Sequence, residues 1–284
     1  MELDLLKEDL RRFLAEDLGS GDITSAALIP PEARGRARVI AKQPGVICGA
    51  GLLVPLLEIL GDVAPQVEAA ADGQPVAVGT EVARARGGYR QLLAAERTYL
   101  NLAQRLSGIA TLTRRFADAL AGTKARVLDT RKTNPGLRAL DRAAVRAGGG
   151  FNHRFGLYDE FLIKENHLAP LRHLPDAVGE AVARARRHQP GKRLTIEVRD
   201  LEECARALAA SPDCILLDNM GLEDLRRCVA LRNRRASPCE LEASGGITLA
   251  NAAAVAATGV ERLSVGALTH SAPALDLSML IEPE

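Results

Sequence analysis

Residues 128–168 read LDTRKTNPGLRALDRAAVRAGGGFNHRFGLYDEFLIKENHL and contain the pattern that the second half of the chain repeats. An apolar run ends at Leu128, polar residues and an expected helix follow, and a second apolar run comes at 161–163. Two passes of the chain, separated by a glycine run, carry a cluster of cations: Arg131, Lys132, His153, Arg154 and Lys164. Because the formal net charge of the chain is only +1, this cluster is local and favours a pocket for a small, multiply anionic ligand.

The alternation of short apolar runs and helical segments continues from residue 122 almost to the end of the chain. The runs lie at 126–128, 161–163, 194–196, 214–217, 240–243 and 262–265, and helices are expected at Leu137–Ala147, Leu171–His188, Leu201–Ala210, Leu222–Arg232 and Leu249–Thr258. Repeated βα units of this length predict a parallel sheet covered by helices. Polar residues follow nearly every run, which favours a barrel over an open dinucleotide-binding sheet.

The first part of the chain has a different texture. Leu3–Leu18 has the apolar spacing of an amphipathic helix that ends at Gly19, and the SGDITS segment after it is typical of a turn. Strands are expected within 36–48, a short helix at 52–60 and a small antiparallel unit at 67–86. From Tyr89 to Leu120 the pattern predicts two helices separated at Ser107–Gly108.

Composition excludes several classes of function. A net charge near zero and 3% aromatic residues argue against a nucleic-acid binder. The five cysteines include no C-x-x-C pair and are expected to be reduced and structural. The N-terminus lacks the features of a signal peptide and no apolar run is long enough to span a membrane, so we expect a cytoplasmic protein that binds no membrane.

Two glycine segments near the end of the chain are candidates for phosphate binding. Ser244, Gly245 and Gly246 lie between a late strand and a helix, where backbone N–H groups can bind a phosphate. Gly266 follows the next strand, with His270 four residues later, and phosphate sites after the last two strands are common in barrels. The alternative is that Gly245 and Gly246 only form a tight βα turn.

Glu197 and Asp218 each end an otherwise apolar strand. Such carboxylates suit Mg²⁺ shared with a substrate phosphate, or hydrogen bonds to sugar hydroxyls, although either could simply cap the following helix. Lys164 also follows a strand and could form the Schiff base of a barrel aldolase, but its cationic neighbours favour anion binding.

Taken together, these motifs closely resemble the quinolinate phosphoribosyltransferase family, the carboxylating nicotinate-nucleotide pyrophosphorylases of NAD biosynthesis. The matching segments occur in family order across almost the whole chain: EDLGSGDITS, AERTYLNLAQRLSGIAT, LDTRKTNPGLR, GGGFNHRFGLYD, LIKENH, LEASGGI and SVGALTHS. The resemblance implies an α/β protein with an incomplete TIM-like barrel (109–271) and an N-terminal α+β sandwich-like domain (1–108) that the C-terminal residues 272–284 complete.

The resemblance also implies a role for each candidate residue. Quinolinate would be bound by Arg131, His153, Arg154, Lys164 and, from a neighbouring subunit, Arg97. Phosphoribosyl pyrophosphate would be bound by Lys132, Glu197, Asp218, Ser244, Gly245, Gly246, Gly266 and His270, with Glu197 and Asp218 also binding Mg²⁺. Lys132, Lys164, Glu197 and Asp218 would be the catalytic residues. The implied enzyme transfers phosphoribose to quinolinate with decarboxylation and acts as a homodimer or larger homo-oligomer with shared active sites.

Three other functions fit parts of the pattern. A paralogue of the same fold could act on a different aromatic acid, as in the molybdenum-utilisation branch. A barrel aldolase would use Lys164 as its Schiff-base residue. A phosphate- or nucleotide-sensing module would keep the glycine loops but would not need the cations that face the dicarboxylate.

Overall fold

The structure is a computed structural model that describes residues 3–63 and 65–284. It divides into two compact units, the first formed by 1–114, 133–149 and 271–284 and the second by 115–132 and 150–270. The division expected from the sequence, 1–108 with 272–284 against 109–271, stays a prediction; the compact units group 133–149 with the first. Among the described residues, no helix has the length and apolarity needed to cross a membrane.

The first unit is built on a four-stranded antiparallel sheet in the order β12-β1-β5-β3, with β1 at Arg34–Ala41, β3 at Gln66–Ala69, β5 at Glu81–Gly88 and β12 at Leu277–Pro283. Alternation along β1 buries Ala37, Val39 and Ala41 and exposes Arg36 and Arg38, so one sheet face is packed and the other is solvated. The C-terminal strand β12 pairs with β1 over 35–41, as the family resemblance implies. A two-stranded ribbon, β2 (Gly45–Val46) with β4 (Pro75–Val76), completes the unit's strands.

The helices of this unit are α1 (Leu3–Leu18), α2 (Ile23–Leu28), η1 (Ala50–Leu52), α3 (Leu53–Ile59), most of α4 (Tyr89–Ala119) and α5 (Arg138–Ala147). The turn predicted for SGDITS is wrong in its second half, where α2 forms. The physical reason is a cap: Asp22 Oδ1 accepts the backbone N–H groups of Thr24 and Ser25, each at 3.0 Å.

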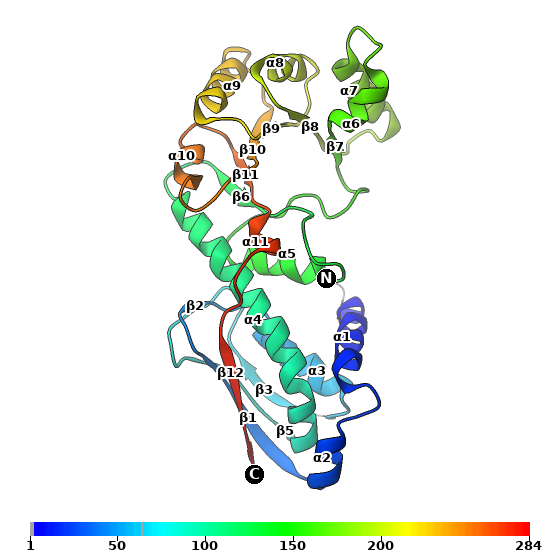
Figure 1. Cartoon of the computed structure of the whole chain (residues 1–284), viewed down its shortest axis with the longest axis vertical. Coiled ribbons are helices and arrows are strands. Elements are labelled where there is room, and N and C mark those ends of the chain that lie inside the picture. The colour runs from blue at the N-terminus through cyan, green and yellow to red at the C-terminus, as the bar shows by residue number, and fades with distance from the viewer. Residues whose placement is uncertain (1–2, 64) are drawn as a thin grey trace. The chain divides into compact units, whose positions relative to one another are not determined.

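The prediction of two helices between Tyr89 and Leu120 is also wrong, because α4 runs unbroken through Ser107 and Gly108. Figure 1 shows this helix running along the sheet of the first unit. Position 108 requires glycine because a Cβ there would overlap the backbone carbonyl oxygen of Pro273. A glycine inside a helical pattern can therefore mark a close backbone approach instead of a break.

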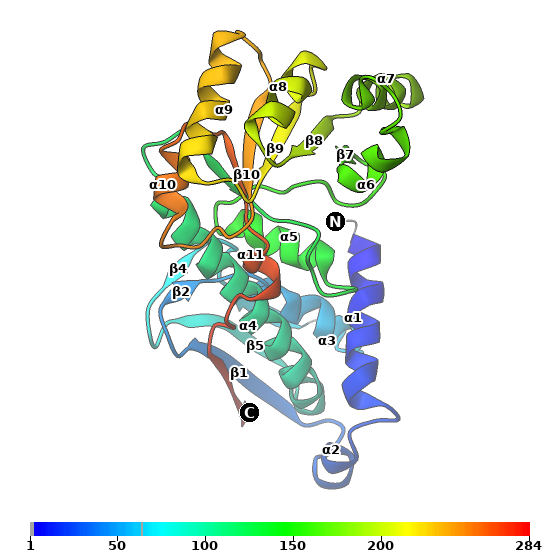
Figure 2. The same cartoon turned by 45° about the horizontal axis from the view of Figure 1, so that its top comes forward.

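The second unit contains a six-stranded parallel sheet in the order β6-β11-β10-β9-β8-β7. The strands are β6 (Arg126–Leu128), β7 (Phe161–Ile163), β8 (Leu194–Val198), β9 (Cys214–Asp218), β10 (Glu240–Ser244) and β11 (Arg262–Ser264), which confirms the six predicted runs. The sheet order leaves β6 and β7 at opposite ends, as in an incomplete barrel. Figures 1 and 2 show helices α8 (Leu201–Ala209) and α9 (Leu222–Arg234) on the outer side of the central strands.

The remaining helices of the second unit are α6 (Glu165–Leu168), η2 (Ala169–Leu171), α7 (Ala177–His188), α10 (Ala252–Ala256) and α11 (Ala267–His270). The helix predicted at 171–188 begins only at Ala177, because Pro175 disfavours helical backbone in the residue before it. Asp176 then caps the new helix by accepting the N–H of Gly179 at 2.8 Å. The helix predicted at 249–258 is shorter and begins at Ala252.

Gly108→Ala should destabilise the protein by about 1–3 kcal/mol, because the added methyl group must displace either α4 or the 273–274 segment. Urea unfolding at neutral pH measures this change. Gly51→Ala is a matched control, since a Cβ at Gly51 meets nothing within 4 Å, and should change the free energy of unfolding by less than about 0.5 kcal/mol. Equal stability of both variants would contradict the close-approach explanation.

Candidate functional site

The polar residues predicted at the strand ends of the second unit lie on adjacent strands. Asp218 at the end of β9 is the direct register partner of Ser244 at the end of β10, and Ser244 is in turn the partner of Ser264 on β11. Glu197 lies near the end of the neighbouring strand β8, beside Leu216. Because side chains alternate between faces, Glu197, Leu216 and Asp218 all point to the same face of the sheet.

The first glycine segment forms a turn that depends on Asn219, a residue that the sequence analysis did not single out. Gly245 and Gly246 have φ angles of 93° and 61°, and Asn219 also has a positive φ, 55°. Asn219 donates its backbone N–H to the carbonyl oxygen of Ser244 at 2.8 Å and its side-chain amide to Asp218 at 2.9 Å. A Cβ at Gly245 would overlap the side chain of Asn219, so the close approach requires glycine here.

Three further predicted residues gather at the end of β11. A Cβ built on Gly266 would lie 3.0 Å from Cδ of Lys132 and 3.2 Å from Nε2 of His270, which places both side chains against the glycine. Thr269 donates its hydroxyl to the carbonyl oxygen of Lys132 at 2.8 Å and so ties the two loops together. The side chains of Lys132 and His270 are exposed, as ligand-binding groups must be.

Arg154 is the buried arginine of the cation cluster, and Arg131, its neighbour in charge, is half-buried. Only 9% of Arg154 is exposed, and its guanidinium donates to the carbonyl oxygen of Glu160 at 3.3 Å. Burial lowers the pKa of Arg154, and the like charge of Arg131 lowers it further, although Asp159 and Glu160 act in the opposite direction. Two arginines that repel each other in a partly desolvated place form a site that an anion would stabilise.

Lys164 lies at the end of β7 and forms an ion pair with Glu197 of β8. The carboxylate is well shielded, with 9% of its side chain exposed, whereas the lysine side chain is 43% exposed. An ion pair favours the ammonium form of lysine, while imine formation requires the neutral amine. This contact therefore speaks against the Schiff-base alternative.

A buried ionic network inside the barrel was missed by the sequence analysis, which treated residues 240–243 as an apolar run. Glu242 is fully buried and accepts Nε of Arg262 at 2.6 Å and the hydroxyl of Ser264, and it contacts Nε2 of His153 at 3.2 Å. Burial raises the pKa of Glu242, but the interactions with His153, Arg262 and Ser264 outweigh burial and lower it to about 2. The strand alternation Glu240, Glu242, Ser244 was the available signal, since it places three polar residues on one face.

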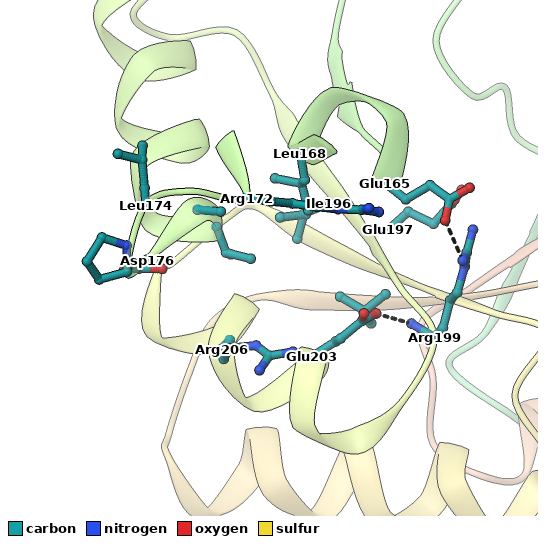
Figure 3. Close-up of a pocket in the computed structure, with 14 residues that line it drawn as sticks. Glu165, Leu168, Arg172, Leu174, Asp176, Ile196, Glu197, Arg199, Glu203 and Arg206 are labelled. Carbon is teal, nitrogen blue, oxygen red and sulfur yellow. Dashed lines mark hydrogen bonds and ion pairs between the residues drawn. The ribbon is translucent and has the colours of Figure 1, made fainter. Parts of the chain in front are cut away.

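A pocket of about 420 Å³ lies on the opposite, outer side of β8 (Figure 3). Its apolar wall includes Leu168, Ile196 and Val198. The side chain of Arg199 pairs with Glu165, and its backbone N–H donates to the carboxylate of Glu203 in α8 at 2.8 Å. Of the predicted site residues, all of which the structure describes, Glu197 alone lines this pocket. Acids and arginines are mixed along its walls, so it does not select for a dianion.

Arg97 is exposed on α4 in the first compact unit, whereas the other predicted site residues all belong to the second.

Within the described part of the chain, no group of three or more His, Cys, Asp or Glu side chains could bind a metal on its own. Two carboxylates at adjacent strand ends fit only an ion that completes its coordination with substrate oxygens, as Mg²⁺ does.

The fold and site define a class of protein: an α/β enzyme with a parallel sheet of incomplete-barrel order, whose strand ends combine cations, two carboxylates and two glycine turns. Two family models match the chain, the N-terminal domain of quinolinate phosphoribosyl transferase over residues 22–107 and its C-terminal domain over residues 109–280. The chain therefore belongs to the quinolinate phosphoribosyltransferase family.

Individual relatives agree over nearly their full length. The nicotinate-nucleotide pyrophosphorylase [carboxylating] of Mycobacterium leprae is 44% identical, with 98% of each chain covered, and a probable enzyme of the same name from Bacillus subtilis is 40% identical, covering 96% of this chain and 92% of the relative. Among solved structures, the nicotinate-nucleotide pyrophosphorylase of Francisella tularensis is 36% identical, with a TM-score of 0.90 and coverage of 99% of this chain and 98% of that one.

Acid should destabilise the protein partly through Glu242. Its pKa of about 2 in the fold lies below the ordinary value of 4.5, so the carboxylate contributes stability that is complete above pH 4.5 and is lost as the pH falls from 4.5 toward 2. The difference in unfolding free energy between the wild type and Glu242→Gln should therefore be largest at neutral pH and shrink in acid. Urea unfolding at pH 7 and at about pH 3 measures it.

Glu202→Gln is the control for this experiment, since the side chain of Glu202 is 80% exposed and pairs only with Arg206 on the surface of α8. This variant should stay close to the wild type at both pH values. A difference between wild type and Glu242→Gln that is the same at neutral and acid pH would show that the carboxylate charge is not the cause.

Proposed function

We propose that the protein transfers the phosphoribosyl group of phosphoribosyl pyrophosphate to quinolinate with loss of CO₂, giving nicotinate mononucleotide and pyrophosphate for NAD biosynthesis. The observation that carries the proposal is the pair of interacting cations, the half-buried Arg131 and the buried Arg154, in a chain that the family models match over residues 22–107 and 109–280. A dicarboxylate between them would relieve their repulsion and form charge-assisted hydrogen bonds.

The dicarboxylate half of the site would act by orienting quinolinate. The two carboxylates would be bound by Arg131, Arg154 and Lys164, which would hold the ring nitrogen toward the ribose. The translational and rotational entropy of the reactants is then lost on binding and does not add to the barrier of the chemical step. After the nitrogen has bonded to the ribose it is a pyridinium, and the adjacent carboxylate can leave as CO₂ because the ring accepts the electron pair. The same cations stabilise the negative charge on the ring carbon until it is protonated.

The sugar-phosphate half of the site would hold the second substrate. The turn of Ser244, Gly245 and Gly246 and the loop at Gly266 and His270 offer backbone N–H groups and a cation to the 5′-phosphate. Glu197 and Asp218 would accept the ribose hydroxyls and hold Mg²⁺ together with the pyrophosphate, and the ion would neutralise charge on that leaving group. The side chain of Lys132 lies against Gly266, and there it would contact the phosphoribosyl group as that group is transferred between the two halves.

Product analysis tests the proposal directly. Purified protein with quinolinate, phosphoribosyl pyrophosphate and Mg²⁺ should form nicotinate mononucleotide, CO₂ and pyrophosphate in equal amounts, and removing Mg²⁺ with a chelator should stop the reaction. Turnover of nicotinate or another aromatic acid without CO₂ release would favour the paralogue. A borohydride-trapped lysine adduct would favour an aldolase, and phosphate binding without any turnover would favour a sensor.

Arg131→Ala should lower kcat/KM for quinolinate by about ten- to 150-fold, because a charge-assisted contact in a shielded site is typically worth about 1.5–3 kcal/mol. Steady-state rates at varied quinolinate measure the loss. Arg187→Ala is the control, since this arginine of α7 is 66% exposed and pairs with Glu180 at the surface, and it should retain wild-type rates. Wild-type turnover by Arg131→Ala would refute its assignment.

We further propose that the active form is a homodimer or larger homo-oligomer in which Arg97 acts in the active site of a neighbouring subunit. An exposed arginine in the family's AERT segment, on a unit other than the one with the remaining ligands, supports this proposal. Arg97→Ala and Arg131→Ala should each lose at least about nine-tenths of the activity. Mixing them under subunit exchange should raise it to about a quarter of the wild-type activity in a dimer, since one site in each mixed dimer then carries neither change. No recovery on mixing would contradict a shared site.

We also propose a cytoplasmic location. The five cysteines are all buried and none forms a disulfide, which suits a reducing compartment. Cell fractionation with an antibody against the chain would test this; recovery in a secreted or membrane fraction would contradict it.

A further inference from the structure

The contacts of His153 suggest a role for it other than binding a substrate carboxylate directly. The residue is 8% exposed, and both of its ring nitrogens are in contact with the protein. Nδ1 accepts the backbone N–H of Arg154 at 2.7 Å, and Nε2 lies 3.2 Å from Oε1 of Glu242. Because a backbone N–H can only donate, Nδ1 must be the acceptor and Nε2 must carry the hydrogen toward the carboxylate.

The backbone around His153 is held at the same place by a second carboxylate. Asp129, which is fully buried at the end of β6, accepts the backbone N–H of His153 at 2.7 Å and the side-chain amide of Asn152 at 2.6 Å. Residues 152–154 are thus each attached to the barrel through a hydrogen bond to Asp129 or to the His153 ring. The last residue of this segment is Arg154. Among the side chains proposed to bind the two substrate carboxylates, that of Arg154 is the most buried.

Glu242 is the residue that anchors the ring. It lies inside the barrel on β10, and its position is determined by Arg262 and Ser264 of the neighbouring strand β11. The chain of contacts runs from Arg262 through Glu242 and His153 to the backbone of Arg154. Such a network fixes the tautomer and the orientation of an imidazole in the way that an outer carboxylate does in metal and triad sites.

We propose that Glu242 is a positioning residue for the dicarboxylate half of the active site, and that His153 transmits its effect to Arg154 instead of binding quinolinate itself. This inference rests on the proposed function, since it concerns how that function's first substrate is bound. The direct contact between His153 and quinolinate, expected from the family resemblance, is the alternative that the experiments below distinguish.

The first experiment compares two glutamates of one strand. Glu240, two residues before Glu242 on β10, also faces the barrel interior, where it pairs with Arg126, Arg193 and Arg262. Calorimetric binding of quinolinate should weaken by about tenfold or more in Glu242→Gln, as for loss of a charge-assisted contact, and by less than about twofold in Glu240→Gln. Binding of phosphoribosyl pyrophosphate with Mg²⁺ should be unchanged by Glu242→Gln, whereas general damage to the barrel would weaken both substrates.

The second experiment uses the two amide replacements of His153 and applies even if Glu242→Gln fails to fold. Asparagine places an acceptor oxygen near the position of Nδ1, whereas glutamine places its amide near the position of Nε2. If His153 positions Arg154, His153→Asn should bind quinolinate more tightly than His153→Gln. If Nε2 contacts the substrate, the order should be reversed, and that order would overturn the proposal.

The third experiment determines which ring nitrogen of His153 carries hydrogen, and it needs no activity assay. The chain has five histidines, and long-range proton–nitrogen correlation spectra of the wild type, assigned with His153→Asn, should show His153 with hydrogen on Nε2 and not on Nδ1. Glu242→Gln should shift these signals, and Glu240→Gln should not. Hydrogen on Nδ1, or equal effects of both glutamate variants, would overturn the link to Glu242. If the wild type binds no quinolinate but shows the expected tautomer, the proposed function fails while this link stands.

Discussion

The buried carboxylate of Glu242 is the constraint on which the geometry of the second unit depends. A charged group in a barrel interior is costly unless hydrogen bonds replace its water, and here Arg262, Ser264 and His153 supply them from three directions. The contacts join β10, β11 and the segment after the glycine run, which are far apart in sequence. Removing one partner would leave a desolvated charge, so the arrangement tolerates little change and keeps the segment that leads to Arg154 in one place.

The distribution of charge explains how a nearly neutral protein can form a strongly cationic site. Several surface arginines form ion pairs along helices, where each pair contributes little. Arg154 is different, because its burial and the like charge of Arg131 disfavour its charged form and lower its pKa. The two halves of the site also differ in their acids: Arg131 follows β6 and Arg154 precedes β7, while Glu197 and Asp218 lie near the ends of β8 and β9. A substrate pair with a dicarboxylate on one side and a metal-bound pyrophosphate on the other matches that division.

Much of the fold could be predicted from local pattern, and the failures have specific causes. The six barrel strands were predicted because buried parallel strands appear as short apolar runs followed by polar residues. Gly108 was misread because a glycine that allows a close backbone approach looks the same in sequence as a helix end. The SGDITS segment was misread because a cap at Asp22 starts a short helix that has too few residues to show a period. The first error arose because the residue that Gly108 approaches is distant in sequence, and the second arose because the helix is short.

The sequence by itself determined the fold class, the family and the identities of the candidate ligands, since these depend on the order of residues along the chain. Only the tertiary structure decided that Glu242 points into the barrel beside Arg262, that His153 uses both ring nitrogens within the protein, and that Asn219 supports the turn at Gly245. The physical reason is that strand register and sheet order decide which side chains meet. Residues as distant as 129, 153, 242 and 262 become neighbours only when the parallel strands align.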